Sequence, residues 1–354
     1  MFFLSTRILS ADDRLPYIQD GSIHLGDIIE SSSLDGMAVM QARDEAQMTG
    51  SAGDLLDFGD EKQGFIVWAR PPVYFVQVLP DMTTGVLPRI EQGCDVRLPL
   101  LPDVDIATLT QSLRKKEVTT EAAESKTQQA QDERDAIAPT LDITVGKPKL
   151  GRITNYLDQP LDELGPVDPK VTRSLPVFNA EPEKGSTESL SRGLATGIIS
   201  VDALTPLGRG QTMLVTGPNG VGRNELALDA VQAQTSDVAC VWACMRGQGK
   251  LVKKELEGRG AMSNTAILEA PRGSPPSIQY ATAAAALAVA EGIRNEGGDS
   301  LVILDDISEL SSFWDDTTRV LLNLLVQILI ISNSLDKNLR YKSYGILMCI
   351  QIWS

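Results

Sequence analysis

The chain contains little histidine and cysteine. Among its 354 residues there is one histidine, His24, and there are four scattered cysteines, Cys94, Cys240, Cys244 and Cys349. This spacing offers no zinc-type ligand cluster. A lone histidine also excludes most catalytic schemes in which a serine or cysteine nucleophile needs a histidine base. We expect four reduced thiols and a partly buried strand position for His24.

Positive charge and long apolar runs are also scarce. Lys and Arg total 32 against 47 Asp and Glu, which gives a net charge of −15. A nucleic-acid binder needs a basic face to neutralise phosphates, so no nucleic-acid partner is predicted. The longest apolar run, Val320 to Ile331, is interrupted by Asn323 and Gln327. It is shorter than the roughly 20 residues that span a bilayer, so no transmembrane segment is predicted.

The first third of the chain has the pattern of a small β-domain. From Ser22 to Leu101, short apolar runs alternate with Gly, Pro and Asp, which favours a β-barrel or sandwich. From Asp105 to Ala138 the composition changes to Gln, Lys, Glu, Ala and Thr, which predicts a solvated helix or a disordered insertion. That insertion is either a tolerated surface loop or a partner-binding helix. We place the domain boundary near residue 140.

From Gly197 onward, strand and helix patterns alternate. The predicted strands are 212–216, 238–244 and 300–306, and the predicted helices are 224–234, 251–258 and 278–294. Alternation of this kind predicts a parallel sheet flanked by helices.

One segment has the frame of a phosphate-binding loop. Gly217-Pro-Asn-Gly220-Val-Gly222-Arg223-Asn224 lies between a predicted strand and a predicted helix, where backbone N–H groups hold an anion. In that motif a Lys reaches the phosphates and a Ser or Thr hydroxyl binds magnesium. Arg223 keeps the charge but not the geometry of the Lys, and Asn224 offers only an amide oxygen.

A second element fits the same kind of site. Asp305 ends the apolar strand 301–304, where a carboxylate holding magnesium through water is expected. The alternative is an acidic strand end that caps the next helix, which is common in α/β proteins.

The stretch Ala195-Thr-Gly-Ile-Ile-Ser-Val-Asp-Ala-Leu-Thr-Pro-Leu-Gly-Arg-Gly-Gln211 closely resembles the segment before the phosphate loop in the alpha subunit of the rotary proton-translocating ATP synthase. Segments 26–38, 145–166, 258–262 and 304–308 also resemble that family, and the resemblance covers roughly residues 20 to 320. It implies an α/β fold with a small N-terminal β-barrel, then a RecA-type phosphate-loop parallel-sheet domain. After about Leu325 it ends, so the family's interface arginine and C-terminal helical domain are expected to be missing.

The resemblance implies four segments along the chain. These are a barrel-like domain at 1–104, the insertion at 105–140, an incomplete nucleotide-binding domain at 141–330 and a divergent tail at 331–354.

The resemblance also implies a site for ATP or ADP with Mg²⁺. Its expected nucleotide-binding residues are Gly217, Gly220, Gly222, Arg223, Asn224 and Gln248. The metal would be held by Asp305, through a water molecule, and weakly by Asn224. Gln248 stands near the position at which the catalytic beta subunit has a glutamate, and an amide is no general base. No residue is therefore expected to be catalytic.

The function implied is that of a non-catalytic, alpha-like component of a proton-transporting ATP synthase, which binds nucleotide weakly or not at all. Its partners would be beta-type subunits in a hetero-oligomeric ring, held peripherally on a chloroplast thylakoid or mitochondrial inner membrane. One alternative is a free-standing pseudo-ATPase that acts as an assembly or regulatory factor. Another is an active ATPase that uses Arg223. Fold alone does not decide among them.

Overall fold

The protein is described by a computed structural model over residues 18–19, 22–31, 36–42, 50–70, 73–80, 86–102, 138–167, 173–179, 190–218, 220–234, 237–315, 317–319 and 347–353. It divides into two compact units, Met1–Leu141 and Asp142–Ser354. Residues 105–137 of the predicted insertion lie outside the described ranges.

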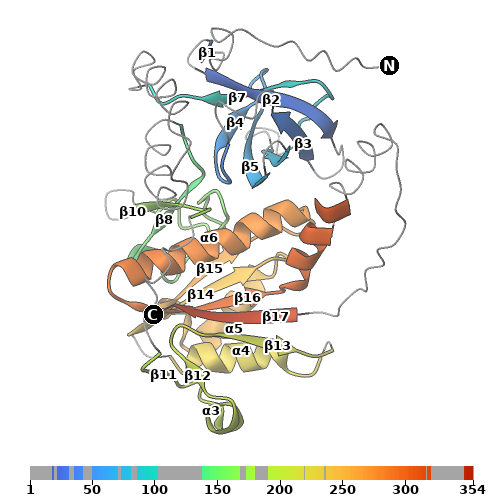
Figure 1. The fold of residues 1–354 in the computed structure, drawn as a ribbon. Helices are drawn as coiled ribbons and strands as arrows, with labels where there is room; N and C mark the ends of the chain where they lie inside the picture. The colour runs from blue at the N-terminus through green and yellow to red at the C-terminus, as the bar shows by residue number, and fades with distance from the viewer. Residues whose placement is uncertain are drawn as a thin grey trace, which may run out of the picture. The chain divides into compact units, whose positions relative to one another are not determined.

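The first unit is the predicted β-barrel. Its strands are β1 (Ile18–Gln19), β2 (Ser22–Ser31), β3 (Met37–Ala42), β4 (Leu55–Asp57), β5 (Gln63–Arg70), β6 (Val73–Val78) and β7 (Asp95–Pro99). They pair antiparallel in the order β1-β2-β3-β6-β5-β4-β7, and β7 pairs back with β2. This last pairing closes a ring of six strands, β2 to β7, and confirms the barrel (Figure 1).

The barrel interior follows the two-residue period of its strands. Alternate residues such as Ala38 and Met40 on β3, and Tyr74, Val76 and Val78 on β6, belong to one buried cluster. Successive side chains of a strand point to opposite faces, so this alternation places one face of each strand inside the ring.

The second unit is built on a six-stranded sheet in the order β13-β17-β16-β14-β15-β9. The strands are β9 (Ile153–Thr154), β13 (Thr212–Thr216), β14 (Val238–Cys244), β15 (Thr265–Glu269), β16 (Asp299–Asp305) and β17 (Leu347–Trp353). β14 pairs in parallel with β15 and β16, and β15 pairs in parallel with β9. The predicted parallel sheet is therefore confirmed in these four strands.

Helices cover both faces of this sheet (Figure 1). α4 (Arg223–Gln232) and α5 (Gly249–Gly258) contribute to a buried cluster that includes Cys240, Trp242 and Cys244 of β14. The long α6 (Pro276–Asn295) packs on the other face, against β14 and β16. Because both of its faces are covered, every residue of β14 is buried, as expected for a central parallel strand.

The smaller elements complete this unit. They are β8 (Asp142–Val145), η2 (Lys147–Lys149), β10 (Arg173–Pro176), β11 (Gly193–Leu194), α3 (Ile199–Leu204), β12 (Leu207–Gly208) and η3 (Met262–Asn264). β8 pairs with β10, and β11 pairs with β12, each in an antiparallel two-stranded sheet. A further helical stretch covers residues 308–315. None of the helices in the described ranges is long and apolar enough to cross a membrane.

The strand β17 comes from the segment that the sequence analysis assigned to a divergent tail. It lies between β13 and β16 and is antiparallel to both, so that Ile350 is paired with Met213 on one side and with Ile303 on the other. Its sequence, Leu-Met-Cys-Ile-Gln-Ile-Trp, is rich in residues with high β-propensity. β13 and β16 thus share β17 as neighbour and run parallel to each other.

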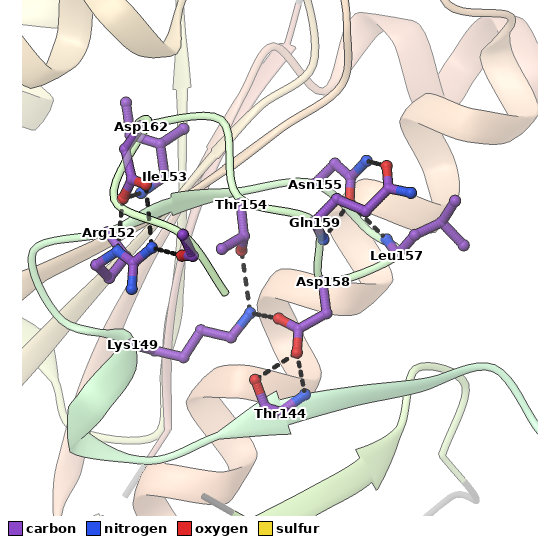
Figure 2. Close-up of polar contacts among 11 residues, drawn as sticks. Thr144, Lys149, Arg152, Ile153, Thr154, Asn155, Leu157, Asp158, Gln159 and Asp162 are labelled. Atoms are coloured by element: carbon purple, nitrogen blue, oxygen red, sulfur yellow. Dashed lines mark hydrogen bonds and ion pairs between the residues drawn. The ribbon is translucent and has the colours of Figure 1, made fainter. Parts of the chain in front are cut away.

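A buried ion pair joins the elements at the start of the second unit (Figure 2). Lys149 is only 1% exposed, its ammonium pairs with Asp158, and it donates a hydrogen bond to Thr154 Oγ1 at 3.0 Å. Asp158 also accepts a hydrogen bond from Thr144 Oγ1 at 2.5 Å. Burial lowers the pKa of Lys149, and the charge of Asp158 opposes that shift. The pair ties β8, η2 and β9 together.

A second ion pair fixes the turn after β9 (Figure 2). Arg152 donates from Nε and Nη2 to the two oxygens of Asp162, at 2.6 and 3.0 Å. The amides of Ile153 and Leu164 also donate to this carboxylate. Burial alone would raise the pKa of Asp162, but these hydrogen bonds outweigh it and lower the pKa to about 2.

Candidate functional site: a phosphate loop at the sheet edge

The loop between β13 and α4 has the backbone that its glycines predict. Gly220 and Gly222 have φ angles of 82° and 92°. Only glycine adopts this left-handed region readily, and Gly222 is also the residue from which α4 starts. Gly217 lies close to Val221, whose Cγ2 would be 3.0 Å from a Cβ at position 217. The loop thus folds tightly over the N-terminus of α4.

Arg223 and Asn224 are the first two residues of α4 and differ in burial. Arg223 is half-buried, and its Cγ and Cδ atoms lie 4.0 and 3.9 Å from the position of a Cβ on Gly217. Its side chain therefore folds back across the loop. Asn224 is exposed. Of the two residues that replace the usual Lys and hydroxyl, only the cation is held against the loop.

Glu225 is a neighbour that sequence reasoning missed. It is exposed in the first turn of α4, and its Oε2 lies 3.9 Å from the position of a Cβ on Gly222. A carboxylate at a helix N-terminus is stabilised by the helix dipole, but it opposes a second anion at the same place. Acidic enrichment in first helical turns is the signal that could have identified it.

Asp305 is the last residue of β16 and lies beside Cys244 of β14. Burial raises the pKa of its carboxyl group, and the charge of Asp306 raises it further. The Trp242 indole and the guanidinium groups of Arg246 and Arg223 act in the opposite direction. Arg223 and Asp305, which are far apart in the sequence, are therefore within electrostatic reach of each other.

Arg246 is fixed by two other carboxylates on the same side of the sheet. Its Nη2 donates to Asp306 Oδ2 at 2.7 Å, and its Nε donates to Glu309 Oε1 at 2.9 Å. Asp306 is 5% exposed and also accepts hydrogen bonds from the amide and hydroxyl of Ser308. This network holds the segment that follows Asp305 against the end of β14.

Gln248 immediately precedes α5 in a tightly packed turn after β14. A Cβ on Gly247, whose φ is 68°, would lie 2.7 Å from the backbone nitrogen of Arg272. The amide of Gly249 donates to Glu269 Oε1 at 3.2 Å. Because β13, β14 and β16 run in the same direction, Gly217, Gln248 and Asp305 all lie at the carboxyl edge of the sheet. This edge is where parallel α/β sheets bind ligands.

The donor set fits a magnesium ion poorly. Among the described residues, no three or more His, Cys, Asp or Glu side chains come together closely enough to hold a metal ion. The predicted ligands are Asn224, which is exposed, and Asp305, which lies within electrostatic reach of two guanidinium groups. A hard dication needs oxygen ligands and is repelled by such cations.

Comparison with known proteins shows which family this edge of the sheet resembles. The sequence model "ATP synthase alpha/beta family, nucleotide-binding domain" matches residues 197–316, which include the loop, Gln248 and Asp305. A protein named ATP synthase subunit alpha from Hydrogenovibrio crunogenus is 35% identical over 185 residues, or 51% of this chain and 36% of that protein. Proteins of the same name from Paracidovorax citrulli and Streptococcus mutans are 33% and 34% identical, over 48% and 51% of this chain and 33% and 36% of theirs.

The matched region thus spans about a third of the length of these relatives. All three are bacterial, so they lend no support to the expected chloroplast or mitochondrial membrane. The loop and the parallel strands β14, β15 and β16 lie within the region, residues 197–316, that is similar to the nucleotide-binding domain of the ATP synthase alpha/beta family.

Proposed function

We propose that the chain is a non-catalytic, alpha-subunit-like component of a proton-transporting ATP synthase. Its loop binds ATP or ADP weakly or not at all, and the chain packs against a beta-type subunit in a hetero-oligomeric ring that associates peripherally with an energy-coupling membrane. The observation that carries this proposal is the altered loop at the carboxyl edge of a sheet whose sequence relatives are named ATP synthase subunit alpha.

The proposed nucleotide contacts come from the loop and the adjacent turn. The backbone amides of Gly220 and Gly222 and the guanidinium of Arg223 contact phosphates, while Gln248 lies near the terminal phosphate. Hydrolysis needs a group that accepts a proton from water, and an amide such as Gln248 is no general base. The site therefore stabilises the subunit and performs no chemistry.

The proposed packing is supported by apolar side chains on α3. This helix has no buried residue, and Ile199 and Leu204 are 85% and 80% exposed. Both residues lie in the stretch 195–211 that precedes the loop. Exposed apolar side chains that gather on one short element are typical of a surface that another protein covers.

Co-expression with a bacterial beta-type subunit tests this function. We expect a hetero-oligomer with fixed stoichiometry in native mass spectrometry and no phosphate release above that of the beta-type subunit alone. Ile199→Asp with Leu204→Asp should weaken assembly, and Leu251→Asp, an exposed leucine on α5, is the matched control. Substoichiometric, dissociable binding would instead support an assembly factor, and no complex at all would contradict the proposal.

A further inference from the structure

We infer that the loop binds nucleoside di- and triphosphates as free anions, without magnesium, and that the Arg223 guanidinium supplies the positive charge at the polyphosphate. This inference rests on the proposed function, because it specifies the form of the ligand at the same site. It replaces the expected Mg²⁺ complex with the uncomplexed nucleotide.

The first step concerns the missing metal ligands. Mg²⁺ demands near-octahedral oxygen ligands and is held by one or two protein oxygens together with substrate phosphates. In the phosphate loop the hydroxyl at the second helical position supplies one of them. Here that position is Asn224, which is exposed and carries an amide. One of the two protein oxygens expected at such a site is therefore replaced by a weaker ligand.

The second step concerns the surroundings of Asp305. Asp305 is paired with Cys244 of the fully buried β14. The carboxylate of Asp306 and the guanidinium groups of Arg246 and Arg223 are within electrostatic reach of it. Trp242, which lies on the same face of the sheet, is 1% exposed. The guanidinium groups repel an added dication, and burial disfavours the charged form of the carboxyl group that would bind it. Asp305 is thus a poor ligand for an added dication.

The third step concerns what Arg223 offers in exchange. Its stem lies against Gly217 near the N-terminus of α4, and helix N-termini offer unpaired backbone N–H groups to anions. A guanidinium presents five N–H donors in a planar fork that matches phosphate oxygens, whereas a Lys ammonium acts as a point charge. Phosphate oxygens that coordinate Mg²⁺ are less available as hydrogen-bond acceptors for the guanidinium. The uncomplexed nucleotide is therefore the better ligand for Arg223.

Glu225 sets the strength of this site and not its metal dependence. Its carboxylate lies beside Gly222 and opposes any polyphosphate, with or without metal. Removing that charge should raise the affinity for ATP in EDTA and in magnesium. Glu225→Gln is therefore a control that changes affinity while it keeps the ratio between the two conditions.

Calorimetry on the full chain tests the inference. ATP, ADP and inorganic triphosphate are titrated in EDTA and in excess magnesium, with adenosine as the uncharged probe. We expect the dissociation constants for ATP in EDTA to be equal to those in magnesium within about twofold, or lower. Arg223→Ala should abolish the binding, and Asn224→Ala should leave the ratio between the dissociation constants in EDTA and in magnesium unchanged. The pair Arg223→Lys with Asn224→Thr should make binding magnesium-dependent by about tenfold or more.

Each other outcome overturns the inference. Binding by the natural chain that magnesium tightens about tenfold would show a working metal site. No heat of binding with ATP, ADP or inorganic triphosphate at millimolar concentration would show that the loop does not bind polyphosphates. Neither result affects assembly with a beta-type subunit, so the failure of this inference and the failure of the proposed function are told apart.

Discussion

The Cδ atom of Arg223 lies 3.9 Å from the position of a Cβ on Gly217, so the cation that replaces the loop's usual Lys is folded over the loop itself. A Lys stem in the same place would carry a compact ammonium, and a Thr at position 224 would add a hydroxyl. We expect Arg223→Lys with Asn224→Thr to tighten Mg-ATP binding about tenfold, or about 1.4 kcal/mol, in calorimetry. Asn224→Ser alone serves as the single-site control. No gain in the double variant would contradict the roles assigned to these two positions.

Glu225 leads to a second prediction. Its carboxylate occupies the positive end of α4, where single charges contribute about 0.3–1 kcal/mol. Glu225→Gln should therefore raise the affinity for ATP by about two- to fivefold, while it lowers helix stability by a similar free energy. Glu255→Gln, on the exposed face of α5, removes the same charge away from the loop and should leave ATP affinity unchanged. Equal effects of the two variants on ATP affinity would show that the change in net charge, and not the position of Glu225 at the loop, is responsible.

Gln248 leads to a prediction about chemistry. Gln248→Glu supplies the carboxylate of a general base, but Arg223 and Asn224 remain in the loop. We expect phosphate release by this variant to stay at background. Activity from the single substitution would show that the loop is catalytically competent as it stands.

Much of the fold follows from patterns in the sequence, because the pattern and the packing agree. The strands expected at 212–216 and 238–244 are observed with those bounds, and the helix expected at 278–294 is α6, Pro276–Asn295. The α5 boundary differs by two residues because the turn at Gly249 is fixed by Glu269, a contact distant in sequence.

What sequence reasoning missed arises from pairings between distant segments. β16 ends at Asp305 and β17 begins only at Leu347, and nothing local indicates that Ile350 is paired with Met213 and Ile303. The Arg152–Asp162 pair, the approach of Arg223 to Asp305 and the carboxylate at Gly222 depend likewise on tertiary folding. A one-dimensional pattern carries periodicity and turn chemistry but not these contacts.

The central position of β17 can be tested through its backbone. Ile350 is paired with strands on both sides, and a proline there lacks the N–H that a ladder needs. Ile350→Pro should lower the free energy of unfolding of the second unit by about 3 kcal/mol or more in urea titrations. Ile350→Val keeps the backbone N–H and should cost much less than the proline substitution. Similar values for the two variants would contradict the pairing.

The buried Asp162 predicts acid sensitivity of the second unit. Its pKa is lowered from an ordinary 3.8 to about 2, so the unfolded chain binds a proton before the folded one does. The stabilisation is therefore fully present above about pH 4 and is lost as the pH falls through about 2, by about 2 kcal/mol in total. Asp162→Asn removes the titrating group and leaves Arg152 without its anion.

Urea titrations between pH 5 and pH 2 measure this effect, with the natural chain and Asp162→Asn compared at each pH. We expect the variant to be less stable at pH 5 and the difference between the two proteins to shrink as the pH falls. Asp142→Asn removes an exposed carboxylate at the start of β8 and should leave the pH dependence of the natural chain unchanged. A constant difference across the whole pH range would show that Asp162 is not held ionised by Arg152 and the amides of Ile153 and Leu164.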